Sequence, residues 1–371
     1  MARMGLGPDW TCLLANDIDA KKMQSYQDNF GVTGTKCCDI AKLKTREMPG
    51  QPDLAWASFP CQDLSLAGNR LGLGGERSSA FWGFWSAINK LKLDGRPPPV
   101  LVLENVCGLL TSHNGKDFSD LCRAMSSLGY FFGAVVADAV RFLPQSRPRL
   151  FVICVRDRSK LSQRLCANGP TAWHNIALQS AVTGMPQDLK SKWIWWKLPE
   201  PQSAPQSLAD LLEDDAVHHR WNSEMETSRL LKMMSSLNLD KVMEAKSRGK
   251  RTVGTIYKRT RIDNGKRLQR AEVRFDGIAG CLRTPGGGSS RQSIIVVEQN
   301  TVRSRLLSIR EAARLMGVHD DYILPHSYND GYHIFGDGLA VPVVSHIARN
   351  LLLPILDAVK SPRKTQRKLA A

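Results

Sequence analysis

The sequence lacks the cysteine pairs of a disulfide framework or a structural zinc site. Its nine cysteines include no Cys-x-x-Cys pair, and only Cys37 and Cys38 are adjacent. An odd number of scattered cysteines indicates reduced thiols in a cytoplasmic compartment. The chain also lacks a signal-peptide pattern and any uninterrupted apolar run of about 18 residues. We therefore expect a cytoplasmic protein that does not span a membrane.

Acidic residues are few relative to basic ones. The chain has 51 Lys and Arg against 35 Asp and Glu, a net charge of +16 and a pI near 9.6. Such an excess is typical of proteins that neutralise phosphates, although basic proteins also bind acidic partners or membranes. With 371 residues, 42% apolar and 23% charged, the chain is expected to be globular, and about 150 residues per domain suggests two domains.

Apolar runs that predict strands alternate with amphipathic stretches that predict helices in the first half of the chain. Strands are expected at 11–15, 53–59, 100–103, 131–137 and 150–155, and helices at 20–29, 79–92 and 116–128. This alternation predicts an α/β fold with a doubly wound, mostly parallel sheet.

The pattern changes after residue 158. Residues 159–302 carry several prolines, a tryptophan cluster (193, 195 and 196), a basic segment and the glycine-rich run 285–290. We expect a second, smaller and irregular domain there. Helical patterns resume at 309–316 and 343–356, so the first domain is predicted to be discontinuous, comprising 1–158 and 303–371.

Three short strings border predicted strands. They are Pro60-Cys61-Gln62, Glu104-Asn105-Val106 and Gln145-Ser146-Arg147-Pro148-Arg149. In open α/β sheets ligands bind at the carboxyl edge. A thiol, a carboxyl group and two guanidinium groups meeting there suit nucleophilic attack on an electron-poor ring.

Taken singly, these residues have simpler interpretations. Cys61 fits a small buried apolar residue, Glu104 a cap or a partner for a surface lysine, and Arg147 and Arg149 ordinary ion pairs. A desolvated Glu104 at the end of a buried strand would instead have the raised pKa of a useful acid.

Two further acids follow short strands near the start of the chain. Asp17-Ile18 lies at the end of the first predicted strand, where an acid commonly accepts hydrogen bonds from a ribose. The alternative is a cap for the helix beginning near Ala20. Asp39-Ile40 is placed to meet an adenine edge in the same manner.

In their order along the chain, these strings resemble the motifs of the DNA (cytosine-5) methyltransferase family, whose cofactor is S-adenosylmethionine. Phe59-Pro-Cys-Gln62 resembles the nucleophile motif, Glu104-Asn-Val106 the acid motif and Gln145-x-Arg147-x-Arg149 the arginine motif. Residues 310–317 and Gly338-Leu-Ala-Val-Pro342 resemble its later motifs. The likeness covers about 10–158 and 303–357, and implies a Rossmann-like class I methyltransferase with a variable recognition domain between.

The resemblance implies a mechanism. A cytosine flipped out of double-stranded DNA would be attacked at C6 by the Cys61 thiolate. Glu104 would hydrogen-bond N3, Arg149 would hold O2, Arg147 would support the pocket, and C5 would then take the cofactor methyl group without a metal. The implied cofactor-binding residues are Asp17, Ile18, Asp39, Ile40, Pro60 and Val341.

Basic residues gather in the middle of the chain. Residues 241–270 hold eleven Lys or Arg against two acids. Solvated surface charge is the simpler interpretation, but the neighbouring glycine-rich run favours phosphate contacts. The expected DNA-binding residues are Gln62, Arg251, Lys258, Arg259, Arg261, Arg283 and Arg291.

The sequence departs from the family at two places. The family opens with a strand and Phe-x-Gly-x-Gly, whereas Met1-Ala-Arg-Met-Gly-Leu-Gly7 resembles the text just after that motif. We expect a sheet without one central strand, unpaired backbone groups on both neighbours and weakened cofactor binding, from a late start site or a truncated product. Leu339 stands in place of an asparagine.

Three functions are compatible with these observations. The first is cytosine-5 methylation of double-stranded DNA by a monomer, with a cognate restriction endonuclease as partner. The others are an RNA cytosine-5 methyltransferase and a non-catalytic DNA-binding protein.

Overall fold

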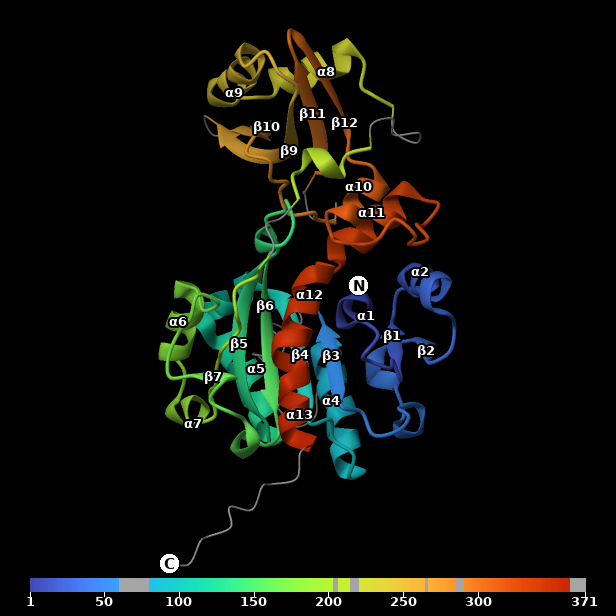
Figure 1. Ribbon diagram of the computed structural model, residues 1–371, viewed down its shortest axis with the longest axis vertical. Helices are drawn as coiled ribbons and strands as arrows, with labels where there is room; N and C mark the ends of the chain where they lie inside the picture. Colours follow the sequence, from blue (N-terminus) through green and yellow to red (C-terminus); the bar gives the residue numbers. More distant parts are fainter. Residues whose placement is uncertain (60–79, 203–205, 214–219, 264–265, 285–289, 361–371) are drawn as a thin grey trace, which may run out of the picture.

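The computed structural model describes residues 1–59, 80–202, 206–213, 220–263, 266–284 and 290–360. Along its long axis the molecule has a lower part built on a sheet with helices on both faces, and an upper part built on a second sheet (Figure 1). Helices α10 (Ile309–Arg314) and α11 (Tyr328–Asp337) lie between them.

The remaining elements of the lower part follow the predicted alternation closely. Its strands are β1 (Ala15–Asp17), β2 (Thr35–Cys37), β3 (Leu54–Ser58), β4 (Val100–Val106), β5 (Phe131–Asp138), β6 (Pro148–Val155), β7 (Cys166–Ala167) and β8 (Trp195–Trp196). Its helices are α1 (Ala2–Leu6), α2 (Ala20–Phe30), α4 (Ala80–Leu93), α5 (Lys116–Ser127), α6 (Ile176–Thr183), α7 (Gln187–Lys190), α12 (Val341–Ile347) and α13 (Leu353–Lys360).

The central sheet has the strand order β3-β4-β6-β5. Strands β3 and β4 are parallel, as are β1 and β2 in a separate two-stranded sheet. Strand β6 instead runs antiparallel to both β4 and β5, because the short connection between β5 and β6 turns the chain back on itself. The sheet is therefore mixed where a mostly parallel one was expected, within the α/β class that was predicted.

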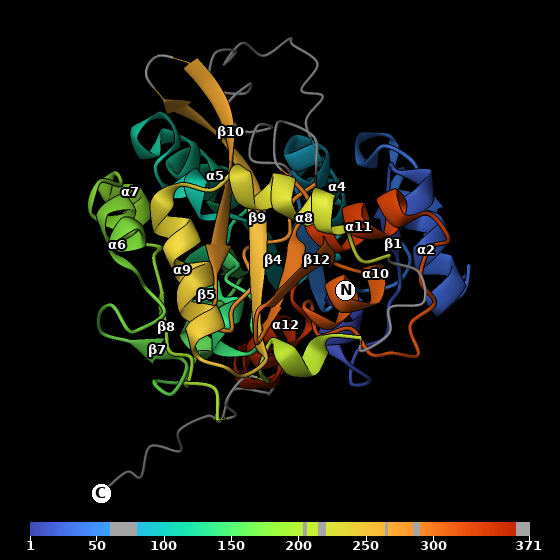
Figure 2. The ribbon, with the colours of Figure 1, turned by 90° about the horizontal axis from the view of Figure 1, so that it is seen from above.

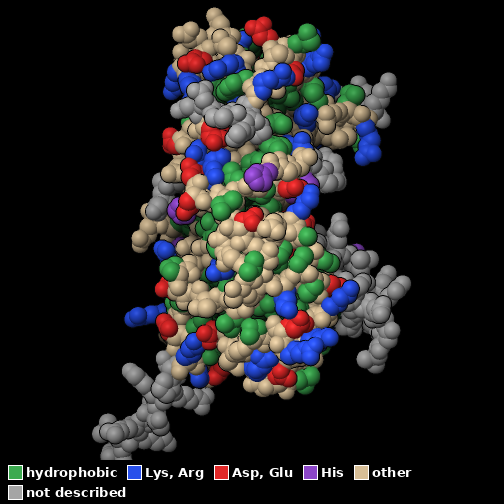
Figure 3. All heavy atoms as spheres, turned by 90° about the vertical axis from the view of Figure 1, so that its right-hand side faces the viewer, with side chains coloured by type: hydrophobic (Ala, Val, Ile, Leu, Met, Phe, Trp, Pro, Cys, Tyr) green, Lys and Arg blue, Asp and Glu red, His purple; other side chains and the backbone are tan. Residues whose placement is uncertain are grey.

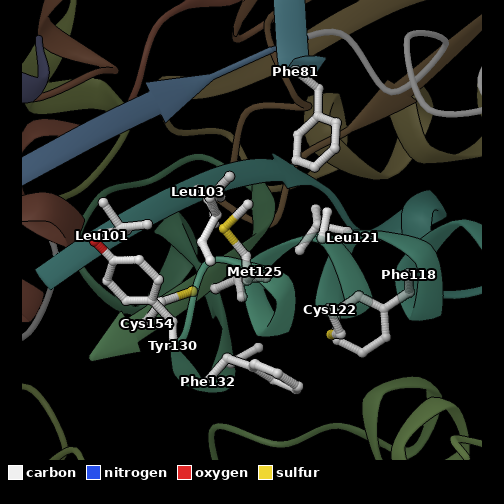
Figure 4. Close-up of a cluster of buried hydrophobic side chains, with 14 of the residues drawn as sticks. Phe81, Leu101, Leu103, Phe118, Leu121, Cys122, Met125, Tyr130, Phe132 and Cys154 are labelled. Carbon is white, nitrogen blue, oxygen red and sulfur yellow. The ribbon is translucent and has the colours of Figure 1, made fainter. Parts of the chain in front are cut away.

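Side chains of the central sheet alternate between two hydrophobic clusters. Leu101, Leu103 and Val152 face the cluster that includes α4 and α5, and Figure 4 shows Phe81, Met125 and Phe132 among its members. Val100, Val102 and Ile153 face the opposite cluster, which includes α12 and α13. A strand that is buried on both faces has a continuous apolar sequence, as the first four residues of β4 do.

Residues 159–198 pack against the central sheet rather than in the upper part. Backbone hydrogen bonds join Phe132 to Lys192 and Ile194 at the edge of β5, and Trp173 and Trp196 are buried in the cluster that includes α12 and α13. The predicted domain boundary at residues 158 and 159 is corrected accordingly, because burial of these tryptophans ties this stretch to the lower part.

The upper part is a four-stranded antiparallel sheet with the order β10-β9-β11-β12. Its elements are α8 (Glu224–Lys232), α9 (Ser236–Ser247), β9 (Thr252–Asp263), β10 (Lys266–Arg274), β11 (Ser293–Glu298) and β12 (Thr301–Leu306). Val242 and Ala245 of α9 pack on the sheet. Because β12 continues to Leu306, the second predicted boundary, at 302 and 303, also falls inside this sheet.

The helical run from Tyr328 to Lys360 is long and apolar enough to cross a membrane by length and composition. More than half of its most apolar window is buried inside the fold. Val344 and Leu352 are fully buried against the central sheet, so the apolar character of this run is explained by core packing.

Candidate active site

Glu104 lies at the carboxyl end of the central sheet. It is the fifth residue of β4 and is the register partner of Ser58, the last residue of β3. The residue is only 7% exposed. Burial raises the pKa of Glu104 above the usual glutamate value, against the lowering effect of the nearby Arg149 and of a hydrogen bond with Ser58.

Arg149 is the guanidinium partner of this carboxyl group. Its Nε lies 3.2 Å from Glu104 Oε1, and both side chains are largely buried. Arg149 is the register partner of Val106 in the antiparallel pair of β4 and β6. Glu104 is therefore positioned by β4, and Arg149 by the neighbouring strand β6. The predicted meeting of an acid and an arginine is therefore found in the structure.

Arg147 has other partners. Its guanidinium donates hydrogen bonds to the carbonyl oxygens of Leu282 (2.8 Å), Gly336 (2.7 Å) and Gly338 (2.6 Å). The side chain is 1% exposed, and burial, with the nearby Arg149, lowers its pKa to about 10. Arg147 thus connects the start of β6 with the segments around Leu282 and around Gly336 and Gly338. It supports the site without lying next to Glu104 as Arg149 does.

Asn105 fixes the chain just ahead of the nucleophile string. Its Nδ2 donates to the carbonyl oxygen of Phe59 at 2.9 Å, and both residues are buried. Pro60, Cys61 and Gln62 lie outside the described residues.

A cavity of about 1050 Å³ connects this acid to the strand ends of the small sheet. Its lining includes Glu104, Asn105 and Arg149 on one side and Asp17 and Ile40 on the other. The cavity also separates β1 from β3, which are not paired with each other. The expected break in the sheet is therefore present at this place.

The acids of the small sheet have distinct local roles. Asp19, not Asp17, caps α2, because its Oδ1 accepts hydrogen bonds from the backbone N–H groups of Lys21 and Lys22. Strand β1 begins at Ala15, four positions after its expected start, and ends at Asp17. Asp39 accepts a hydrogen bond from Ala41 N at 2.9 Å.

Ile18 and Val341 were both expected near the cofactor, and they differ in their surroundings. Ile18 is 72% exposed, an unusual setting for a branched apolar side chain next to a cavity-lining acid. Val341 begins α12, and its N–H donates to the carbonyl oxygen of Met316. Leu339, rather than Val341, lines the cavity from this region.

Gln62 lies outside the described residues, and the other expected DNA-binding residues lie in or beside the upper part. Arg251 precedes β9, whereas Lys258, Arg259 and Arg261 are on it. Glu272 of β10 pairs with both Arg259 and Arg261. Arg283 is exposed beside the junction of the two parts.

Arg291 is held by two neighbouring residues of helix α11. Its guanidinium lies 5.3 Å from the centre of the Tyr328 ring and donates to Asn329. On the face of the molecule that carries α2, basic and acidic side chains are interspersed (Figure 3). The positive excess is therefore not gathered on that face.

Two residues with clear roles were not assigned from the sequence. Ser58 hydrogen-bonds Glu104; its signal was a hydroxyl residue ending an apolar strand. Gln145 is fully buried, with Nε2 donating to Leu315 O at 2.6 Å and Oε1 accepting from Leu282 N at 3.3 Å. Its presence in the arginine string was the only sequence signal.

Comparisons with known proteins converge on one family. A family model described as C-5 cytosine-specific DNA methylase matches residues 2–353. The type II methyltransferase M.HhaI of Haemophilus parahaemolyticus is 25% identical over 343 residues, covering 92% of this chain and 87% of its own. M.DsaV of Dactylococcopsis salina, also a type II methyltransferase, is 24% identical over 348 residues, covering 92% and 79%.

Solved structures show the same fold at lower identity. A Spodoptera frugiperda DNMT2 mutant superposes with a TM-score of 0.55 at 17% identity, covering 96% of this chain and 95% of its own. The Dnmt2 methyltransferase of S. pombe gives a TM-score of 0.51 at 16% identity, with coverages of 93% and 91%.

Proposed function

This chain belongs to the C-5 cytosine-specific DNA methylase family, which transfers the methyl group of S-adenosylmethionine to C5 of cytosine in DNA, and we propose that Cys61, Glu104 and Arg149 carry this reaction. The observation that carries the assignment is the buried Glu104–Arg149 pair at the carboxyl end of β4. It lies beside Phe59, the residue from which the nucleophile string continues.

The residues present fit the nucleoside half of the cofactor. Asp17 and Ile40 line the cavity at the ends of the small sheet, where an acid suits a ribose and an apolar side chain suits a base. Ile18, Asp39, Pro60 and Val341 complete the proposed set. Bound S-adenosylmethionine supplies an electrophilic methyl group.

Each side chain has a defined task in the proposed reaction. The Cys61 thiolate adds to C6 of the extruded cytosine, so a C–S bond forms and the C5–C6 double bond supplies its electrons to C5. Glu104, whose pKa is raised by burial, donates a hydrogen bond at N3. Arg149 holds O2, and Arg147 positions the pocket through three backbone carbonyl groups.

After methylation at C5, loss of the C5 proton to a base restores the double bond and expels the Cys61 thiolate. The pair of Glu104 and Arg149 is buried, so the developing charge on the ring is met by fixed groups instead of by solvent. Gln62, Arg251, Lys258, Arg259, Arg261, Arg283 and Arg291 are the proposed contacts to the DNA.

The form of the DNA and the cellular setting are further parts of the proposal. The name of the relatives, type II methyltransferase, supports double-stranded DNA as substrate and a cognate restriction endonuclease as partner. We assign the enzyme to the cytoplasm as a monomer. The eight described cysteines are all free, which suits a reducing compartment.

A covalent trap tests the proposed chemistry. Duplex DNA containing 5-fluorocytosine at candidate sites should give a gel-shifted adduct with S-adenosylmethionine present, because fluorine at C5 cannot leave as a proton does. Cys61→Ser should abolish the adduct. Cys107→Ser is the matched control, since burial raises the pKa of this neighbouring thiol and the adduct should persist.

Two results would overturn the proposal. One is an adduct that survives Cys61→Ser. The other is DNA binding without any adduct at saturating S-adenosylmethionine, which would instead support a non-catalytic DNA-binding protein. An adduct on RNA alone would identify an RNA methyltransferase.

A further inference from the structure

The β9–β10 hairpin extends well beyond the sheet to which it belongs. Strand β11 pairs with β9 only from Thr252 to Ile256, whereas β10 pairs with β9 up to Asp263. Residues 257–263 and 266–272 therefore form a two-stranded arm, which projects from the body of the molecule when the structure is seen from above (Figure 2). We call this segment the arm.

The two faces of the arm differ in composition. Directly paired residues of antiparallel strands share a face, so the register places Thr260 with Gln269 and Ile262 with Arg267. This face, with Lys258 at its base, is called the open face. The opposite face, called the paired face, carries Tyr257, Arg259, Arg261, Leu268 and Glu272.

Glu272 organises the paired face. It bonds Arg261, whose Nε is 2.9 Å from its Oε1, and lies 3.6 Å from Arg259 Nε. The Arg259 guanidinium also covers the Tyr257 ring at 4.4 Å. These arginines are held in a fixed row along one side of the arm.

The open face has no such partners. Within the described part of the chain, no hydrogen bond or ion pair joins the side chains of Thr260, Arg267 or Gln269 to another residue, and all three are exposed. Ile262 is 78% exposed, although branched apolar side chains are usually buried. Uncommitted donors, acceptors and an apolar group on one surface suit contact with a partner.

We propose that the arm enters the major groove of duplex DNA with its open face toward the base edges. The groove admits a two-stranded ribbon, and glutamine, arginine and apolar side chains match adenine, guanine and the thymine methyl group respectively. Seven basic residues between Thr252 and Arg274, against two acids, complement the phosphates. The proposal rests on the proposed function for its choice of duplex DNA.

The two faces then have separable roles. The open face discriminates between base sequences around the methylated cytosine, whereas Arg259 and Arg261 contact the backbone without regard to sequence. Strand β10 leads into the segment that contains Leu282, whose carbonyl oxygen accepts a hydrogen bond from Arg147 of the lower part, so the arm also sets the register of the DNA over the active site.

A binding selection tests this division. The protein and its variants are each used to enrich sequences from a random-sequence DNA duplex library, and the preferred sequences are then compared by affinity. Thr260→Ala combined with Gln269→Ala should reduce the preference for the selected sequence over a scrambled duplex by at least about fivefold, with little change in affinity for the scrambled duplex.

Two exposed apolar residues provide a matched pair. Ile262→Ser, on the open face, should also reduce sequence preference, whereas Leu268→Ser, on the paired face and 41% exposed, should leave it unchanged. Urea unfolding of all variants verifies that the fold is retained. Loss of preference in Leu268→Ser but not in Ile262→Ser would overturn the assigned faces.

The selection is independent of the chemistry. If no 5-fluorocytosine adduct forms yet open-face variants lose sequence preference, the proposed reaction fails and the arm proposal stands. If the enzyme methylates DNA but open-face variants keep the original preference, the arm proposal fails alone. Selective binding of RNA duplexes by the open face would also overturn it.

Discussion

Arg147 and Arg149 are separated by one residue, yet their guanidinium groups meet different partners. Arg147 donates to backbone carbonyl oxygens, including those of Leu282 and Gly338, whereas Arg149 pairs with the side-chain carboxyl group of Glu104. The hydrogen bonds of Arg147 stabilise the junction of the two parts. The ion pair of Arg149 lowers the pKa of Glu104 in the cavity.

Replacing Arg147 should chiefly affect folding. Arg147→Ala would remove a guanidinium donor from the carbonyl oxygens of Leu282, Gly336 and Gly338, and each buried group left unsatisfied costs about 1–3 kcal/mol. We expect the free energy of unfolding to fall by about 3 kcal/mol or more, measured by urea denaturation. Arg141→Ala, a half-exposed arginine paired with Glu200, is the control and should change it by about 1 kcal/mol or less. Equal losses would contradict the assigned role.

Replacing Arg149 should chiefly affect catalysis. Arg149→Gln removes the cation that lowers the pKa of Glu104, so this pKa should rise further and the acid should remain protonated to higher pH. We expect kcat to fall by about 100-fold or more, with KM for DNA nearly unchanged. Steady-state methyl transfer across a pH series measures both. A change confined to KM would show that Arg149 serves only in binding.

His174 is expected to make stability pH-dependent. It is 2% exposed, and burial lowers its pKa to about 4 from a usual 6.5. The fold therefore favours the neutral imidazole: the stability that this gives is complete above about pH 6.5 and is lost progressively as the pH falls toward about 4. His174→Asn should flatten this acid limb in urea denaturation between about pH 7.5 and 5. If His174→Asn leaves the pH dependence of the free energy of unfolding unchanged, other groups cause the loss of stability in acid.

At the scale of elements, the strand edges beside the cavity are the least protected part of the lower sheet. Among the described strands, β3 pairs only with β4, and its other edge faces the cavity. Unpaired amides exchange with solvent faster than those in a closed ladder. In native-state hydrogen exchange, the cavity-side amides of β3 should exchange at least about tenfold faster than those of β4, which has a partner on both sides. Equal protection would show that the edge is covered in solution.

Several elements of the lower part could be predicted because hydrophobic periodicity alone defines them. Strands β3 and β5 and helices α2 and α5 begin within a residue of their predicted starts. Strand β1 was misplaced because the apolar residues 11–14 suggested a strand, whereas in the structure they line the cavity. Helix α11 was missed because it contains Gly331 and Gly336, which lower helix propensity and are used for close packing against Ile309 and Thr284.

The candidate site was predictable only in part. Glu104 and Arg149 come from strings at strand ends, and their pairing follows from neighbouring strands. The partners of Arg147 and Gln145 could not be predicted, because they are backbone groups about 135–190 residues away in sequence. Tertiary contacts of that range depend on how the two parts dock, which no local pattern encodes.

At the scale of the molecule, the net charge of +16 must be distributed so that DNA binds over the active site. The face carrying α2 mixes both signs (Figure 3), whereas the arm and Arg283 concentrate positive charge in the upper part and at its junction with the lower part. Charge of this kind contributes to affinity through the release of counterions. The salt dependence of binding therefore reports where the DNA lies.

Arg283 provides the sharpest test of this placement, because it is exposed beside the segment that Arg147 fixes. If Arg283 contacts a phosphate, Arg283→Gln should weaken binding of all duplexes and reduce the slope of log Kd against log salt by about 1. Arg123→Gln on α5, where the arginine pairs with Asp188, removes the same charge far from the upper part and should leave the slope unchanged. Fluorescence anisotropy over a salt series measures both slopes, and equal changes would mean that net charge, rather than a located DNA path, governs binding.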